Sequence, residues 1–233
     1  ITQDTLGRPG ELIQLVDNLE YQSSYLFQTD YVRPLGEKTS YELGSRATLR
    51  TINNDYGLDE VLSDGSLIAD PTFNNQFTFI ENVYAAYGIY NGTIGESMTY
   101  QLGLRGEITD LTTEVESDTL NNRSYANLFP STFFTYSISP LSDIQVSYSR
   151  RISRPGFRTL APFFGFSDNR NFYSGNPNVN PEFTDSYETG YVRYFEKGSL
   201  YSGIYYRHRS GVIERITVVE ERNGEEFTRF FPI

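Results

Sequence analysis

The sequence predicts an all-β protein built on one antiparallel, up-and-down sheet of about 8 to 10 strands. Three observations predict it: residue character alternates with a period of two, connections alternate between short and long, and the composition favours strands. The 233 residues include 19 Tyr, 17 Phe and 19 Gly, with no Cys and no Trp. Aromatic residues are enriched in strands, and a chain of this length fits a single β domain.

Alternation with a period of two is the main signal for strands. In residues 100–109, Tyr, Leu and Ile occupy one face, whereas Gln, Arg, Glu and Thr occupy the other. Residues 41–50 and 144–153 repeat this pattern. One face of each predicted strand is therefore apolar and the other polar. Less regular strand-like stretches lie at 81–90, 129–138, 186–195 and 200–209.

The predicted connections fall into two classes of length. Short turns built from Gly, Pro, Asn and Ser lie at 33–38, 91–96, 140–143 and 196–199, and long loops lie at 53–75, 110–127 and 153–181. Short turns on one edge of a meandering sheet and long loops on the other are the plan of an outer-membrane β-barrel. The acidic residues of 53–60 belong to one of these loops and predict a solvated surface rather than a calcium site.

The apolar faces can be placed against lipid or against a second sheet. A soluble sandwich would bury them, whereas a membrane barrel would expose them and add aromatic belts near the strand ends. No run approaches the roughly 18 apolar residues that a transmembrane helix requires. The aromatic side chains that favour the membrane barrel are Tyr31, Tyr41, Tyr90, Tyr100, Tyr194 and Phe195.

Charge and composition argue against several other functions. The net charge of −11 argues against a nucleic-acid partner, which would need clustered Lys and Arg. Catalysis and transition-metal binding lack the necessary groups, because the only histidine is His208 and there is no cysteine. We therefore expect no enzyme activity and no cofactor.

The stretch SRRISRPGF at 149–157 joins a strand to the third long loop. Arg154-Pro155-Gly156 should end the strand, because proline cannot donate to the ladder and glycine permits the bend. One interpretation pairs Arg151 and Arg154 with lumen acids such as Glu107 or Glu188, or with anionic head groups. The other makes a ligand-contacting loop of Arg151, Arg154, Phe157, Arg158, Phe163, Phe164, Phe166, Arg170, Phe172, Tyr173 and Asn176. In the run 175–182, Asn and Pro are also expected to set turns.

Five stretches of the chain carry a recognisable pattern: TDYVRPLGEKTSYELG (29–44), ENVYAAYG (81–88), YQLGLRGE (100–107), LFPSTFFTYSIS (128–139), and YSRRISRPGFRTLAPF with SGNPNVNPEFTDSYETGY (148–191). Together they resemble the barrel of the outer-membrane TonB-dependent receptor family, in particular its branch common in Bacteroidetes-type bacteria. The resemblance implies a bacterial outer-membrane protein for energy-coupled uptake of a scarce siderophore, vitamin, glycan or peptide. It also implies a plug domain, the TonB energy-coupling protein, lipid and a solute as partners, with a surface lipoprotein as a further candidate.

The sequence shows no plug domain, signal peptide or C-terminal closing strand, so we expect residues 1–233 to be one partial barrel domain. Two other functions stay open at this point. One is a porin-like or adhesin-like barrel without energy coupling, and the other is a soluble β domain that binds a partner through aromatic loops. An open sheet has two unpaired edges, so we also expect the isolated chain to associate or misfold.

Overall fold

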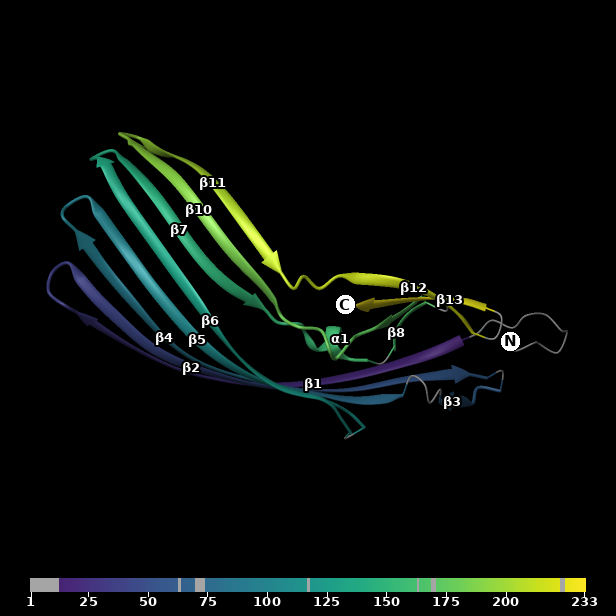
Figure 1. The fold of residues 1–233 in the computed structure, drawn as a ribbon. Coiled ribbons are helices and arrows are strands. Elements are labelled where there is room, and N and C mark those ends of the chain that lie inside the picture. The colour runs from purple at the N-terminus through teal and green to yellow at the C-terminus, as the bar shows by residue number, and fades with distance from the viewer. Residues whose placement is uncertain are drawn as a thin grey trace.

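The computed structural model describes residues 13–62, 64–69, 74–116, 118–162, 164–168, 171–222 and 225–233. A large antiparallel sheet dominates it, and each long strand pairs with the next strand of the meander (Figure 1). In spatial order the strands are β1 (Ile13–Pro34), β2 (Thr39–Val61), β4 (Asn75–Ile94), β5 (Met98–Val115), β6 (Asp118–Ser139), β7 (Ser142–Ser153), β10 (Glu182–Phe195) and β11 (Gly198–Ser210), with β3 (Leu67–Ala69) beside β2. The predicted up-and-down sheet is confirmed.

All four predicted short turns are present along one end of this sheet. They leave only residues 35–38, 95–97, 140–141 and 196–197 outside the strands. Gly36 and Gly95 adopt positive φ angles of 81° and 64° in two of these turns. Only glycine adopts this left-handed conformation without a steric penalty, so these two residues favour their turns directly.

Two of the predicted long loops are wrong in part or in whole. The segment 110–127 consists mainly of strand, because β5 continues to Val115 and β6 begins at Asp118. In the segment 53–75, β2 continues to Val61, so the predicted acidic loop at 53–60 is a strand. Apolar residues still alternate in these extensions, and pairing with equally long neighbours satisfies their backbone groups. The turn that follows β2 is closed by Asp64, whose pKa is lowered because the Ser66 side chain and backbone both donate hydrogen bonds to its carboxylate.

The third predicted long connection, 153–181, is confirmed and carries structure that the sequence pattern did not predict. It contains α1 (Phe157–Leu160), β8 (Phe164–Asp168) and β9 (Asn171–Ser174). The last two join β12 (Arg215–Arg222) and β13 (Glu225–Pro232) in a four-stranded sheet of order β12-β13-β9-β8, where β13 and β9 run parallel. Among the described residues, no helix has the length and apolar character to cross a bilayer.

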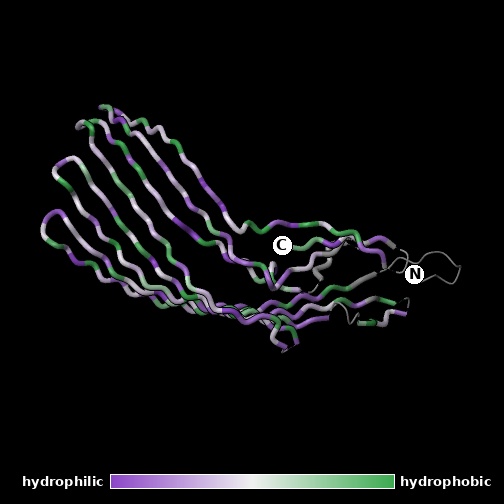
Figure 2. The backbone as a smooth tube through the Cα atoms, viewed as in Figure 1, coloured by the Kyte–Doolittle hydropathy of each residue, from purple (hydrophilic) through white to green (hydrophobic). Residues whose placement is uncertain are grey.

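The large sheet has two faces of different character, and hydropathy alternates along its strands (Figure 2). On the outer face, Phe27, Tyr84, Ile108 and Leu128 are between 44% and 63% exposed. On the inner face, which α1 covers, Glu107 and its neighbours along the strand are mostly buried. Five of the six predicted aromatic residues lie on the outer face near the short turns, where the rings of Tyr31 and Tyr41 are 6.2 Å apart and those of Tyr90 and Tyr100 are 6.0 Å apart. The sixth, Tyr194, was predicted wrongly, because the alternation along β10 places it on the inner face.

The main apolar core lies between the inner face and the long connection. The sheet contributes Ile52, Phe77, Phe79 and Leu111, and the connection contributes Leu160, Ala161 and Val179. Burial of these side chains is the main apolar force that holds the connection against the sheet. We call the described part of residues 154–181 the covering segment.

The two edges of the large sheet predict how the isolated chain will behave. Within the described residues, β1 pairs only with β2, and β11 pairs only with β10. Unpaired strand edges offer donors and acceptors to other chains. We expect the isolated 233-residue chain in detergent to sediment as a mixture of oligomers. A monodisperse monomer in analytical ultracentrifugation at high concentration would contradict this prediction.

Candidate functional site

The covering segment is fixed at its start by Arg154. Strand β7 ends at Ser153, one residue before Arg154-Pro155-Gly156, as the sequence predicts. The Arg154 guanidinium donates to the Glu107 carboxylate at 2.5 Å and to the Thr109 hydroxyl at 2.9 Å. The predicted pairing of Arg154 with a lumen acid is therefore confirmed for Glu107. The other suggested acid, Glu188, pairs with Arg207 at 3.7 Å instead.

Glu107 is shared between two cations. Its second carboxylate oxygen accepts a hydrogen bond from Arg105 at 2.5 Å, and its side chain is only 8% exposed. A buried carboxylate is stable as an anion only when it is paired and hydrogen-bonded. Glu107 therefore anchors Arg154, the first residue of the covering segment, to the inner face of the sheet.

The polar contacts continue from Arg105 across the sheet to β1. The Arg105 guanidinium lies over the Tyr87 ring, 5.6 Å from its centroid, and the Tyr87 hydroxyl donates to Asp30. Tyr87 reaches Asp30 by lying across Gly44, where an added Cβ would be 2.2 Å from the ring. A polar network thus crosses the inner face from β1 to the covering segment.

The C-terminal end of the covering segment is held by hydrogen bonds from side chains of β6 to its backbone carbonyl groups. Arg123 donates to the Val179 carbonyl at 2.7 Å, and Asn121 donates to the Pro177 carbonyl at 2.6 Å. Within the segment, the Gly175 amide donates to the Ala161 carbonyl at 2.7 Å. These contacts hold the segment against β6 at one side.

Gly175 gives a sharp test of this packing. A Cβ added there would lie 2.5 Å from the Ala161 carbonyl oxygen and 2.6 Å from the Thr159 carbonyl oxygen, both of which are backbone atoms. Overpacking against backbone typically costs about 1 to 3 kcal/mol. We expect Gly175→Ala to expose the covering segment to protease, measured by limited proteolysis. Gly106→Ala is the matched control, because its added Cβ meets only the end of the Leu128 side chain at 3.5 Å. Equal cleavage of the two variants would contradict the prediction.

The structure brings some of the predicted ligand-contacting residues together in pairs. Arg158 lies over the Phe157 ring, 5.6 Å from its centroid, and is 3.7 Å from Glu20. Tyr173 is half-buried, and Arg215 lies 5.1 Å from its ring centroid. Cation–π contacts of this kind hold both aromatic rings in place.

The remaining predicted residues are placed separately. Arg151 lies on the inner face opposite Thr184 and is exposed. Asn176 donates to the Pro232 carbonyl at 3.1 Å and accepts from the Asn178 amide at 3.0 Å, so its predicted turn-setting role is confirmed. Phe164 pairs with Ser174, Phe166 pairs with Phe172, and Phe172 also pairs with Arg229, whereas Phe163 and Arg170 lie outside the described residues.

A cavity of about 310 Å³ opens on the inner face beside this network. The inner-face side chains of Gln28, Arg46, Tyr87, Arg105 and Phe129 line it. None of these residues was predicted as a site residue. The signal in the sequence was the alternation itself, which places both arginines on the polar faces of their strands.

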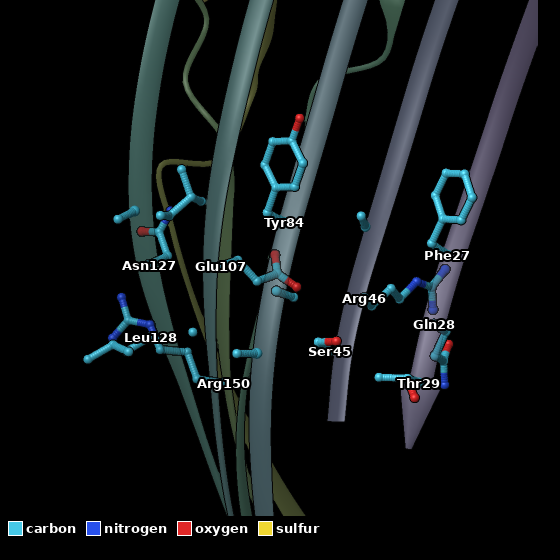
Figure 3. Close-up of a pocket in the computed structure, with 16 residues that line it drawn as sticks. Phe27, Gln28, Thr29, Ser45, Arg46, Tyr84, Glu107, Asn127, Leu128 and Arg150 are labelled. Atoms are coloured by element: carbon cyan, nitrogen blue, oxygen red, sulfur yellow. The ribbon is translucent and has the colours of Figure 1, made fainter. Parts of the chain in front are cut away.

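A second hollow, of about 1080 Å³, lies on the outer face. Figure 3 shows its lining, which includes Phe27, Tyr84, Leu128 and Arg150. Inner-face residues such as Glu107 also belong to the lining, because each lies between two outer-face residues of the same strand. The hollow forms because alanine, serine and glycine fill the middle of the outer face, at 45, 47, 86, 106 and 126.

An open sheet with an apolar outer face, aromatic residues near its turns and a polar inner wall defines a segment of a membrane-spanning β-barrel. The chain belongs to the outer membrane protein beta-barrel family, whose model matches residues 2–231. It is therefore a protein of the bacterial outer membrane. The outer face lies against lipid, and the inner face lines the lumen.

Solved structures of outer-membrane receptors and transporters have a similar fold. The unliganded ferric citrate transporter FecA aligns with a TM-score of 0.54 and 15% identity over 85% of this chain and 29% of its own. The alcaligin receptor FauA from Bordetella pertussis aligns with a TM-score of 0.55 and 13% identity over 94% of this chain and 35% of its own. The ferric yersiniabactin uptake receptor FyuA from Yersinia pestis aligns with a TM-score of 0.53 and 11% identity over 87% of this chain and 30% of its own.

The chain thus spans about a third of the length of the receptors that it resembles. A comparison with curated protein sequences gave no match. The likeness to the solved structures concerns the fold, because the identities are low. By its family model the chain is an outer-membrane β-barrel protein, and it shares the fold of these solved receptors.

Proposed function

We propose that this chain is the partial barrel domain, residues 1–233, of a TonB-dependent receptor that takes up a scarce nutrient with coupled energy. We place the receptor in the branch common in Bacteroidetes-type bacteria, on the motifs at 29–44 and 148–191. Family membership and the fold of solved uptake receptors support the proposal. The nutrient is a siderophore, vitamin, glycan or peptide.

The observation that carries the proposal is the covering segment itself. It is anchored to the lumen wall by Arg154 and by the apolar core, so it occupies the path of a solute entering from the long-loop side. A barrel for free diffusion needs an open lumen, whereas an uptake receptor needs a gated one. Side chains exposed on or beside this segment, such as Arg151 and Arg158, are available to contact the solute.

The two faces of the sheet suit the proposed partners. The polar inner wall offers hydrogen-bonding groups to a plug domain in the lumen, and the plug in turn engages the TonB energy-coupling protein. The apolar outer face and its hollow are covered by outer-membrane lipid. A surface lipoprotein is a further proposed partner, which would close the long-loop side of the barrel. No step of this function requires catalysis.

The proposed function is tested directly by asking whether solute uptake depends on energy. Cells that carry the intact receptor are given radiolabelled ferric siderophores, a cobalamin, an oligosaccharide and a peptide, with and without a protonophore. We expect one class to accumulate and the protonophore to abolish its accumulation. Cells without the receptor provide the baseline. Accumulation of several classes at a rate that the protonophore does not change would show passive diffusion and would overturn the proposal.

A further inference from the structure

The lumen wall is rich in arginine although the chain as a whole is acidic, with a net charge of −11. The wall is the part of the inner face that lies between two rows of residues paired across β1, β2, β4, β5 and β6. One row is Asp30, Gly44, Tyr87, Arg105 and Phe129, and the other is Ser24, Arg50, Glu81, Leu111 and Arg123. Within these rows arginines occupy positions 46, 50, 105 and 123, and Arg154 is added by the covering segment. Carboxylates occupy only positions 30, 81 and 107. The cations therefore outnumber the anions on this surface.

The carboxylates of this wall are already engaged by internal partners. Glu81 accepts from Arg50 at 2.8 Å, and Asp30 accepts from Tyr87 and from Gln28. Glu107 alone faces both Arg105 and Arg154. The positive charge of the wall is thus compensated only in part.

Two of the arginines line the inner cavity of about 310 Å³. Arg46 is exposed there and forms no ion pair with any residue that the structure describes. Arg105 uses its Nε for Glu107, and its side chain remains 31% exposed. Gln28 adds a polar group, and Tyr87 and Phe129 add aromatic surfaces. Guanidinium groups bind carboxylate and phosphate oxygens by charge-assisted hydrogen bonds.

We propose that the cavity at Arg46 and Arg105 binds a carboxylate or phosphate group, so that the solute that this barrel admits is an anion. This inference rests on the proposed uptake function and deepens it by naming the class of solute. The cavity opens to the lumen and would meet the solute during its passage. Low-dielectric walls strengthen the attraction compared with bulk water.

Binding of simple anions to the intact, detergent-solubilised receptor tests the inference. Isothermal titration calorimetry with citrate and with pyrophosphate measures the affinity at low salt, with glycerol as the uncharged probe. We expect binding of at least one anion and none of glycerol. Arg46→Gln and Arg105→Gln should each weaken anion binding about tenfold, and Arg46→Lys should weaken it less, because a lysine keeps the charge but not the fork.

The matched control is Arg33→Gln, which removes the same charge from the outer face near the short turns, where Arg33 pairs with Tyr41. It should leave anion binding unchanged. Equal affinity of the wild type and both cavity variants, or no binding of either anion, would overturn the inference. Protonophore-sensitive uptake that these variants do not alter would overturn the inference alone. Anion binding that depends on Arg46, in a receptor without energised uptake, would overturn only the uptake function.

Discussion

Replacing Arg154 with alanine is expected to release the covering segment from the lumen wall. The substitution leaves the Glu107 carboxylate, which is 8% exposed, with Arg105 as its one cationic partner. Removing one partner of a buried ion pair costs about 3 to 5 kcal/mol, and the remaining Arg105 places the expected loss near the lower end. Thr109 also loses its hydrogen bond from Arg154.

Release of the covering segment can be measured by limited proteolysis of the intact receptor in detergent. A urea titration monitored by circular dichroism measures the accompanying loss of stability. Faster cleavage within 154–181 is the expected result. Arg158→Ala is the matched control in the same segment, because Arg158 is 74% exposed and its contact with Glu20 is 3.7 Å long. Exposed pairs contribute about 1 kcal/mol or less. Similar cleavage of both variants would show that Arg154 does not anchor the segment.

Replacing Leu160 with alanine should weaken the same docking through the apolar core. Leu160 is fully buried in one cluster with Phe77, Phe79 and Leu111 from the wall. Truncating a buried leucine typically costs about 2 to 5 kcal/mol, because it loses transfer free energy and leaves a cavity. The expected result is a lower urea midpoint for opening of the segment, measured by the protease assay at increasing urea.

Two further variants separate this effect from the general effect of a leucine substitution. Leu160→Met keeps the volume and should cost less than about 1.5 kcal/mol. Leu120→Ala removes the same atoms from a side chain that is 42% exposed on β6, and it should leave the segment closed. Loss of docking in Leu120→Ala equal to that in Leu160→Ala would contradict the assignment of Leu160 to the core.

The membrane-spanning part of the fold could be predicted from the sequence, whereas the extensions beyond it could not. Residues 41–50 and 100–109 alternate so regularly that strand and face follow directly. In 53–60 and 110–116, Asn, Asp and Thr are frequent, and such residues also favour loops. Their strand conformation depends on pairing, for example of Asp55 with Leu19 and Gln76. Local sequence does not encode that partner.

The candidate site was predictable in part for the same reason. Glu107 was one of two acids suggested for Arg154, because alternation places it on the polar face. The cavity residues Arg46 and Arg105 were not predicted, since nothing in the sequence says which polar side chains of neighbouring strands share a hollow. The stagger of β1, β2, β4 and β5 decides this.

The strand period, the short turns and the two faces follow from the sequence alone, because these depend on residues that are neighbours in the chain. Three features depend on the three-dimensional packing instead: where the connection 153–181 folds, how β9 pairs with β13, and which cations remain uncompensated. Those features join residues far apart in sequence, such as Arg154 and Glu107, which are separated by 47 positions. A contact at this separation is fixed by the packing of the whole sheet, and no local preference specifies it.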